Sequence, residues 1–384
     1  MIPLSVPSIR GNEWVYIKDC LDTGWVSSAG AYVERFEQDI CRVTGADYAV
    51  ACVNGSAALQ VALQVVGVQA DDEVMVPTLT FIAPVNTIRY LNANPIFMDA
   101  DAFYNIDVEK TIQFIQNETV FREGFSYNKT SGKRISAIIP VHIYGNAVDL
   151  ESLVPICQER NIKIVEDATE SLGTYYTQGN LNGQYTGTIG DVGCYSFNGN
   201  KIITTGGGGM IVTSNEAVAQ KARYLTTQAK DDPVRYIHHE VGYNFRLTNI
   251  QAAMGVAQLE KLAEYIEIKT RNYKRYQQEI EHIRGLHIAE TPNYACSNYW
   301  FYCLQIDKDI YGKDREQLMA FLAAKGVQAR PVWYLNHRQK PYRHCQSYQI
   351  ETAWALWEKT LNLPCSVDLT PNDVAYVVSV LKHA

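Results

Sequence analysis

The sequence predicts an α/β protein: a large domain with a mostly parallel central sheet, followed by a smaller α+β domain at the C-terminal end. Three observations predict this fold class. Short β-rich runs alternate with helical stretches through the first two thirds of the chain, which is typical of a parallel sheet covered by helices. The runs are apolar on both faces, as buried parallel strands are. At 384 residues, the chain is also too long for one ordinary hydrophobic core.

The predicted elements of the large domain follow one another in a regular order. The first strand is YAVACV at 48–53, and the helical run SAALQVALQVV follows it. Further strands are predicted at 73–77, 96–100, 135–142, 162–168 and 192–197. A polar stretch at 118–134 interrupts this alternation, and we expect it to form an exposed excursion.

The last third of the chain has a different pattern. A long helical pattern begins at Asn249 and is broken near residues 290–298. A strand-like WFYCLQI, a helix and a second strand, VQARPVWY, come after the break. We therefore expect a large domain over residues 1–250, and a long connecting helix with a small C-terminal domain over residues 251–384.

Composition excludes several classes of function. The net charge of −7 gives no electrostatic reason to expect nucleic acid or an anionic membrane as a partner. No apolar run approaches the length that crosses a bilayer, and the first residues lack the features of a signal peptide, so we expect a cytoplasmic protein. The nine cysteines are scattered without a CxxC pair, so we expect neither a disulfide framework nor a metal site.

One lysine stands in an unusual setting, SFNGNKIITTGGGG at 196–209. Lys201 precedes Ile202 and Ile203, and burying an unpaired ammonium beside such residues is costly. The four glycines at 206–209 precede the strand-like MIVT, so we expect a tight turn between strands that holds Lys201 close to the sheet. From this window alone, a lysine that extends its amine from a strand end into water is the alternative.

A phosphate site is predicted where the first strand meets its helix, in CVNGSAALQVAL at 52–63. The free N–H groups and the dipole of a helix beginning there attract an anion, and Ser56 adds a hydroxyl. N-capping by Asn54 or Ser56 needs the same geometry, so both interpretations stay open. The common nucleotide-binding fingerprints, GxGxxG and GxxxxGK[ST], do not occur in a suitable place.

Two further features lie at predicted strand ends. The strand IKIVED ends in Glu166 and Asp167, where ligands bind in open α/β sheets, although Asp167 could instead cap the helix that follows. Phe81 follows the strand EVMVP, where an aromatic side chain is either part of the core or a stacking surface. Together with Gly55 and Ser56, these residues and Lys201 fit one ligand, pyridoxal 5′-phosphate. That cofactor needs an amine for a Schiff base, a carboxylate at its ring nitrogen, a flat side chain over its ring and a phosphate site.

At this point the chain resembles the DegT/DnrJ/EryC1/StrS sugar aminotransferases, which have the aspartate aminotransferase fold type I and depend on pyridoxal phosphate. The likeness covers nearly the whole length in ordered blocks. These are GWVSSAGAYVERFE, NGSAALQVAL, PTLTFIAPVNTI, PVHIYGNAVDL, VEDATESLGTYY, GDVGCYSFNGNKIITTGGGGMIVT, GYNFRLTNIQAAMGVAQL and RPVWYLNHRQKPY. Many relatives read TGEGG where this chain has four glycines, and this departure marks a difference in substrate rather than in cofactor.

The resemblance implies a role for each matching residue. Lys201 is expected to be the Schiff-base lysine and proton carrier, with Asp167 at the ring nitrogen. Glu170, where relatives often have glutamine, is expected near the phenolic oxygen of the ring. Phe81 is expected to stack on the ring. The phosphate is expected at Gly55, Ser56, Ser196 and, from a neighbouring subunit, Asn244, which implies a homodimer with a shared active site.

The resemblance also implies the substrates. We expect L-glutamate as the amino donor and C4 of a nucleotide-linked 4-keto-6-deoxy sugar as the acceptor. The UDP-linked 2-acetamido sugars of bacillosamine or legionaminic acid synthesis are the expected class, with Trp25, Arg330 and His337 in contact with substrate. For the segment ARPVWYLNHRQKPY, a polar surface loop is the alternative. The open alternatives in function are another keto nucleotide sugar, GDP- or dTDP-linked and aminated at C3 or C4, and a non-enzymatic α/β nucleotide-binding protein.

Overall fold

The computed structural model describes residues 1–384, and its large domain is built on one extended sheet. The strands of its main path are β1 (Tyr48–Cys52), β2 (Glu73–Pro77), β3 (Asn94–Met98), β6 (Arg134–Ile138), β7 (Lys163–Asp167), β9 (Val192–Ser196), β10 (Gly209–Thr213) and β15 (Ser347–Tyr348). Their order is β1-β10-β9-β7-β6-β2-β3-β15. Along this path only β10 is antiparallel to the strands beside it, so the predicted mostly parallel sheet is confirmed.

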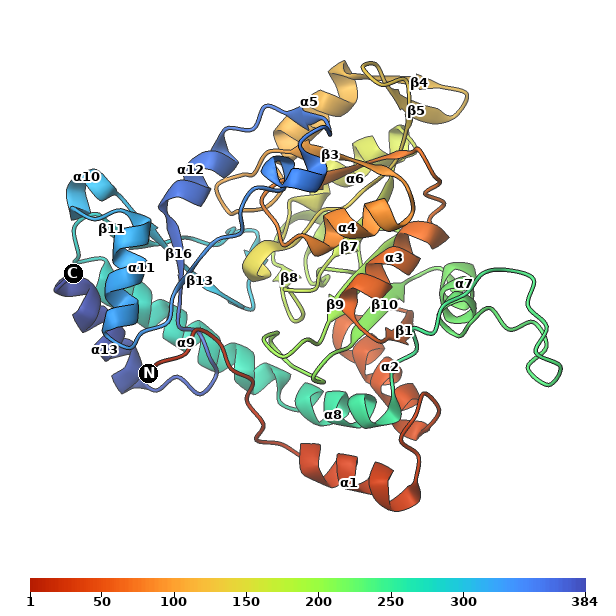
Figure 1. The fold of residues 1–384 in the computed structure, drawn as a ribbon, viewed down its shortest axis with the longest axis horizontal. Helices are drawn as coiled ribbons and strands as arrows, with labels where there is room; N and C mark the ends of the chain where they lie inside the picture. Colours follow the sequence, from red (N-terminus) through yellow and green to blue (C-terminus); the bar gives the residue numbers. More distant parts are fainter.

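The sheet is buried on both faces, as the continuous apolar runs predict. Val74 and Val76 of β2 pack into one apolar cluster, whereas Met75 between them packs into another. Helices cover the sheet, except that α1 packs outside this layer on α8 (Figure 1). They are α1 (Glu13–Thr23), α2 (Ala31–Thr44), α3 (Gly55–Val65), α4 (Ala83–Tyr90), α5 (Val108–Asn117), α6 (Leu150–Glu159), α7 (Glu216–Thr226) and α8 (Asn249–Leu259). Side-chain N-caps begin several of them, including Asp107, Asp149, Asn215 and Thr248.

The small domain is a second, antiparallel sheet with helices. Its strands β11 (Leu286–Ile288), β13 (Tyr302–Ile306), β16 (Thr360–Leu363) and β14 (Arg330–Pro331) lie in that order. Its helices are α9 (Leu262–Ile280), α10 (Lys308–Tyr311), α11 (Arg315–Ala324), α12 (Thr352–Lys359) and α13 (Pro371–Lys382). The N-terminal segment also reaches this domain, because Ile2 N donates a hydrogen bond to Gly326 O at 2.8 Å.

The C-terminal segment returns to the large domain before it completes the small sheet. β15 pairs with β3 at the edge of the large sheet, and the buried Asp99 accepts hydrogen bonds from the backbone N–H groups of Glu351, Thr352 and Ala353 at the start of α12. Both chain ends thus cross between the two sheets. The division of the chain at residue 250 stays a prediction.

Three segments that the sequence analysis singled out are the helical pattern from Asn249, the polar stretch at 118–134 and the glycine run at 206–209. The helical pattern from Asn249 forms two helices, α8 and α9, with the break at Glu260 and Lys261. α8 packs on α1 and α2, while α9 runs toward the small sheet, so tertiary packing divides one helical pattern into two directions (Figure 1). The polar stretch at 118–134 forms the hairpin of β4 (Thr119–Arg122) and β5 (Phe125–Asn128). In the glycine run, Gly206 and Gly208 have φ of +78° and +132°, which a side chain would disfavour.

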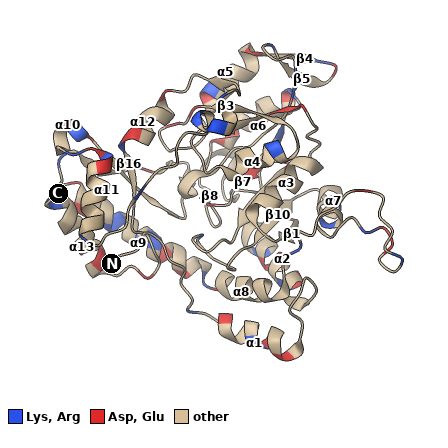
Figure 2. Ribbon diagram, viewed as in Figure 1, with Lys and Arg blue, Asp and Glu red and all other residues tan.

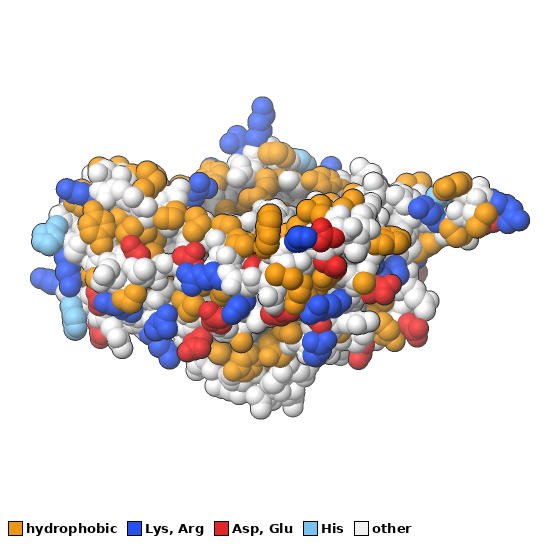
Figure 3. Space-filling model, turned by 90° about the horizontal axis from the view of Figure 1, so that it is seen from below, with side chains coloured by type: hydrophobic (Ala, Val, Ile, Leu, Met, Phe, Trp, Pro, Cys, Tyr) orange, Lys and Arg blue, Asp and Glu red, His pale blue; other side chains and the backbone are white.

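The surface has two features that bear on partners. Acidic and basic residues are interspersed over the elements rather than segregated (Figure 2). Between α7 and α8 the middle of the connecting segment 227–248 leaves the body as an extended arm (Figure 1) that carries hydrophobic side chains near its end (Figure 3), whereas Ala229 and Leu247 near the two ends of the segment are buried. Val234 and Val241 on this arm are each 81% exposed, and Tyr236 is 73% exposed. No helix is both long enough and apolar enough to cross a membrane.

Candidate functional site

The carboxyl ends of the parallel strands surround a cavity of about 370 Å³. Eight of the residues predicted for the site line it: Gly55, Ser56, Phe81, Asp167, Glu170, Ser196, Lys201 and Arg330. They come from the ends of three strands, the start of one helix and the small domain. Such convergence is expected where the strands of an open α/β sheet end.

The start of α3 forms one wall of the cavity. Asn54 is the N-cap, since its side chain accepts a hydrogen bond from Ala57 N at 2.8 Å. Capping therefore falls to Asn54, and the N–H groups of Gly55 and Ser56 in the first turn have no acceptor within the helix. Gly55 packs closely against the end of β9, because a Cβ at Gly55 would lie 2.9 Å from Ser196 Cβ. The arrangement fits an anion held between the helix start and Ser196.

Lys201 lies in the connection between β9 and β10, with its side chain only 12% exposed. Its Nζ lies 3.6 Å from Glu170 Oε1 and 4.2 Å from the centroid of the Trp300 ring. Trp300 is held in turn, because its Nε1–H donates to Asn200 O at 2.6 Å. The buried amine thus has a carboxylate on one side and an aromatic face on the other, which are the contacts that stabilise an ammonium.

Two buried carboxyl groups face the same cavity. Asp167 ends β7, accepts a hydrogen bond from Thr169 N at 3.1 Å, and burial raises its pKa. Glu170 accepts a hydrogen bond from Tyr144 N at 2.8 Å, and burial raises its pKa to about 7. Titratable groups shifted in this way in a cavity are typical of functional sites.

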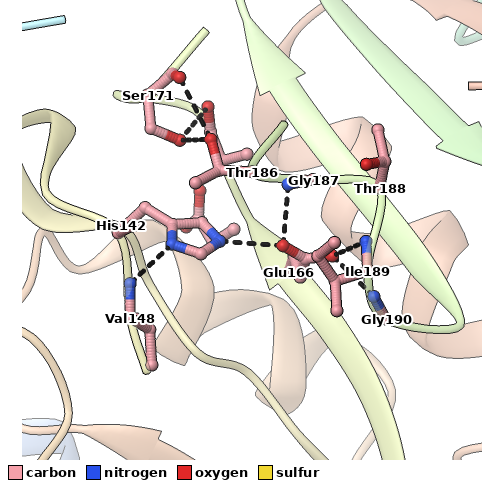
Figure 4. Close-up of polar contacts among 12 residues, drawn as sticks. His142, Val148, Glu166, Ser171, Thr186, Gly187, Thr188, Ile189 and Gly190 are labelled. Carbon is pink, nitrogen blue, oxygen red and sulfur yellow. Dashed lines mark hydrogen bonds and ion pairs between the residues drawn. The ribbon is translucent and has the colours of Figure 1, made fainter. Parts of the chain in front are cut away.

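Behind these residues lies a buried polar network (Figure 4). Glu166 accepts hydrogen bonds from His142 Nε2 at 2.9 Å and from three backbone N–H groups, those of Gly187, Ile189 and Gly190, at 2.6 to 2.7 Å. Val148 N donates to His142 Nδ1, so the imidazole proton lies on Nε2 and is donated to Glu166. The network ties the loop at 187–190 to β7.

The same network reaches the turn that carries Glu170. Ser171 Oγ and Thr186 Oγ1 are 2.8 Å apart, and Thr186 immediately precedes the loop that Glu166 holds (Figure 4). Tyr144, whose N–H contacts Glu170, lies two residues after His142. Glu170 is therefore fixed from both sides by groups that do not enter the cavity.

Three of the predicted site residues do not line this cavity. The side chain of His337 turns toward the large sheet, where Nδ1 lies 2.7 Å from Thr78 Oγ1 and the ring packs near Phe97 and Trp354. Trp25 lines a separate hollow next to α1 and α2. Asn244 is exposed at the base of the arm.

Two tryptophans of the site escaped the sequence reasoning. Trp300 and Trp333 line the cavity from the small domain, and Trp333 stacks on Tyr144 with ring centroids 4.8 Å apart. Phe81, which is 53% exposed, lies 6.3 Å from the Trp333 ring. Trp333 lies in the block RPVWYLNHRQKPY, but its local sequence does not predict a contact with this cavity, and both tryptophans reach the site through long-range packing.

The residues that line the cavity fit pyridoxal 5′-phosphate. An amine, a buried carboxyl group at a strand end, an aromatic side chain and a helix start without a Cβ at its first position all open into one cavity. A cluster of three or more His, Cys, Asp or Glu side chains suited to a metal ion does not occur. The site is therefore suited to covalent amine chemistry and anion binding.

Comparisons with known proteins agree with this chemistry. The model of the DegT/DnrJ/EryC1/StrS aminotransferase family matches residues 7–382. The chain is 35% identical to the GDP-perosamine synthase of Caulobacter vibrioides over 387 residues, covering 100% of this chain and 98% of that protein. It is 34% identical to EpsN of Bacillus subtilis (strain 168), by its name a candidate pyridoxal phosphate-dependent aminotransferase, over 100% and 95% of the two chains. Among solved structures, DesI in the presence of its TDP-sugar product is similar, with a TM-score of 0.87, 25% identity and coverage of 100% and 92%.

Proposed function

Because the chain belongs to the DegT/DnrJ/EryC1/StrS aminotransferase family, we propose that it transfers an amino group from L-glutamate to C4 of a nucleotide-linked 4-keto-6-deoxy sugar. The family consists of sugar aminotransferases that depend on pyridoxal 5′-phosphate, so the protein is an enzyme of that class. The observation that carries the proposal is the amine of Lys201, which lies in one cavity with Asp167, Glu170 and the start of α3.

The cofactor, when bound, supplies a carbon that exchanges an amino group and a ring that accepts electrons. The first turn of α3 and Ser196 bind its phosphate, since their free donors face the cavity. Asp167 would hold a proton on the ring nitrogen: burial raises the pKa of this carboxyl group, and a positive group beside it would offset that cost and favour the carboxylate. Phe81 lies at the mouth of the cavity, where its face is free to pack on a flat ring.

Lys201 moves a proton in both half-reactions. Its amine must be neutral to take a proton from the donor's Cα, and it returns the proton when the acceptor sugar is aminated. The cavity limits the access of water to the amine, which keeps this proton within the site. Lys201 and Asp167, the amine and the carboxyl group that this chemistry needs, line the same cavity, which supports catalysis here.

Arg330 is the best-placed residue for substrate recognition. It is exposed at the start of β14 and lines the cavity from the small domain. Its planar fork suits either the carboxylate of glutamate or the diphosphate of a nucleotide sugar. His337 is bonded to Thr78 instead, so our proposal assigns substrate contact to Arg330 and no longer to His337.

The comparisons change which nucleotide we propose for the acceptor sugar. A relative that matches this chain from end to end is named a GDP-perosamine synthase, which favours a GDP-linked sugar over the UDP-linked sugars expected from the motifs. The assignment to bacillosamine or legionaminic acid synthesis has no support from the comparisons. We therefore propose a GDP-linked 4-keto-6-deoxy sugar as the acceptor.

A homodimer completes the proposal. The arm exposes Val234, Tyr236 and Val241, which a second copy of the chain would cover. Asn244 lies at the base of the same arm and outside this chain's own cavity, as expected for a residue that serves the neighbouring subunit.

All nine cysteines are free thiols, which supports a location in the reducing cytoplasm.

The proposed function is tested by incubating the protein with L-glutamate and a panel of 4-keto sugars linked to GDP, UDP or dTDP. Mass spectrometry of the products should show amination of the GDP-linked sugar ahead of the others. Preferred amination of a UDP-linked sugar would overturn the nucleotide assignment. A protein that binds no cofactor and aminates none of the panel would instead be a non-enzymatic member of the fold.

A further inference from the structure

The amine of Lys201 has a single carboxylate within ion-pair distance, that of Glu170. Oε1 of Glu170 lies 3.6 Å from Nζ, while Oε2 is occupied by the N–H of Tyr144. The opposite side of the amine is covered by the Trp300 ring. A proton that leaves Lys201 toward the protein therefore has one acceptor in reach, and that acceptor has one oxygen free of backbone donors.

Glu170 is held in this position independently of the cavity. Asn298 Nδ2 donates to Glu170 O at 2.9 Å, and the hydroxyls of Ser171 and Thr186 lie within hydrogen-bond distance of each other (Figure 4). The side chain is only 3% exposed. Its orientation toward Lys201 is therefore a fixed property of the fold.

We propose that Glu170 is the proton acceptor of Lys201: one N–H bond of the ammonium breaks, its electron pair stays on Nζ, and the proton forms an O–H bond with Oε1. The ion pair thereby becomes a neutral amine and a neutral carboxylic acid, and the return transfer restores the ion pair. The inference deepens the proposed function, on which it rests. It assigns to Glu170 a catalytic role beyond contact with the ring of the cofactor.

The surroundings of Glu170 favour this exchange. Four titratable groups face it: Lys201, Asp167, Tyr144 and Cys303. Burial raises the pKa of both the Tyr144 phenol and the Cys303 thiol well above their ordinary values, so neither carries charge at neutral pH. Burial also raises the pKa of Glu170 to about 7, which brings its proton affinity closer to that of an amine. Moving the proton removes two opposite charges from a site that hydrates them poorly.

The distance of 3.6 Å is longer than a hydrogen bond and must shorten for the transfer. Catalytic hydrogen bonds are commonly long in the free protein and tighten when ligands bind. The long side chain of Lys201 has enough freedom to close the gap, since Trp300 contacts it through a ring face rather than through a directed bond.

The first test measures the amine in the full chain without cofactor. Wild type, Glu170→Gln and Asp167→Asn are trace-labelled with acetic anhydride across a range of pH, and labelling of Lys201 is followed by peptide mass spectrometry. Loss of the adjacent carboxylate should lower the midpoint of labelling by about one pH unit or more in Glu170→Gln. The shift should be smaller in Asp167→Asn, which is not within ion-pair distance. Equal midpoints in Glu170→Gln and wild type would overturn the proposal.

The second test uses the cofactor-loaded enzyme and L-glutamate alone, with the visible absorption band as the readout. If Glu170 accepts the proton, Glu170→Gln should react about tenfold to a hundredfold more slowly, although its amine loses a proton more easily. Formate should restore much of the rate in Glu170→Ala, where it fits the vacated space, and not in Glu170→Gln, where the amide fills it.

The outcomes separate this inference from the proposed function. A wild-type protein whose band does not respond to glutamate contradicts the proposed function itself. A responsive wild type with an equally fast or faster Glu170→Gln protein shows that Glu170 only holds the ammonium in place, and overturns the proton transfer. Lack of rescue by formate in a folded Glu170→Ala protein does the same.

Discussion

Glu166 and Glu170 lie close together in the sequence, one in β7 and one in the turn that follows it, and both are buried, yet the protein surrounds them in opposite ways. Glu166 accepts four hydrogen bonds, one from His142 and three from backbone N–H groups. Glu170 accepts one from Tyr144 and otherwise faces the amine of Lys201. A fully satisfied carboxylate stabilises a structure, whereas one with an unfilled acceptor keeps capacity for a ligand or a proton.

The largest effect on activity is expected at Lys201, which faces Glu170, the glutamate with the unfilled acceptor. Lys201→Ala should abolish transamination, since no other amine lines the cavity to carry the proton. Stability should fall little, because truncation removes a charge and leaves only Glu170, which can take up a proton. Product analysis by mass spectrometry and thermal unfolding together check this. Turnover near the wild-type rate would show that Lys201 is not the reactive amine.

Glu166→Gln should produce the largest loss of stability. The amide replaces an acceptor with a donor that points at backbone N–H groups, so we expect a decrease in the free energy of unfolding of about 3 kcal/mol. Urea unfolding of the variant measures the change. Glu109→Gln, at an exposed position on α5, is the matched control and should change stability little. A loss no greater than that of the control would contradict the structural role of the network.

Glu170→Gln should change how stability depends on pH. A carboxyl group with a higher pKa in the folded chain binds its proton more tightly when folded, so its ionisation costs stability as pH rises from about 4.5 to about 7. The variant lacks this cost, and its stability relative to wild type should increase by about 1 to 3 kcal/mol across that window. Unfolding of the cofactor-free chain at pH 5 and pH 8 measures it. A constant difference at both values would mean that Glu170 ionises normally.

Arg330→Ala tests recognition at the mouth of the cavity. Loss of a charge-assisted pair should raise the KM for glutamate or the nucleotide sugar about tenfold to a hundredfold. The visible band of the bound cofactor should stay unchanged. Steady-state kinetics with each substrate varied in turn measures the effect. An unchanged KM for both substrates would show that Arg330 of the small domain does not take part in substrate binding.

The smallest effect is expected for His337→Ala. Its ring is bonded to Thr78 beside Phe97, outside the cavity, and burial lowers its pKa. We expect less than about a threefold change in either KM, because no direct contact with substrate is lost. Calorimetric titration with each substrate, alongside Arg330→Ala, gives the comparison. If His337→Ala weakens substrate binding as much as Arg330→Ala does, His337 contacts the substrate and our assignment is wrong.

The sequence predicts the parts of the site that follow from strand ends and helix starts. Lys201, Asp167 and Ser56 meet because parallel strands end at one edge of a sheet, and the alternation of strands and helices predicts that edge. The sequence does not predict placements that depend on tertiary packing. Trp300 enters the site from the small domain, and His337 turns toward β2. No periodicity encodes either placement.

Glu166 shows a signal that could have been used. Adjacent side chains of a strand point to opposite faces, so only one of Glu166 and Asp167 can face the cavity. The other must find partners behind the sheet, where His142 and the loop at 187–190 supply them. The sequence does not specify how many hydrogen-bond donors Glu166 finds, because the loop that supplies most of them lies more than twenty residues away along the chain.

We propose above all that the Lys201 cavity takes an amino group from glutamate with pyridoxal phosphate. The direct measurement is the visible absorption spectrum of the cofactor-loaded wild-type protein, titrated with L-glutamate alone while 2-oxoglutarate is quantified. We predict a shift of the band that saturates, with formation of about one 2-oxoglutarate per Lys201 site before any sugar is added. A folded, cofactor-loaded protein whose band stays unchanged and that forms no 2-oxoglutarate would contradict the claim.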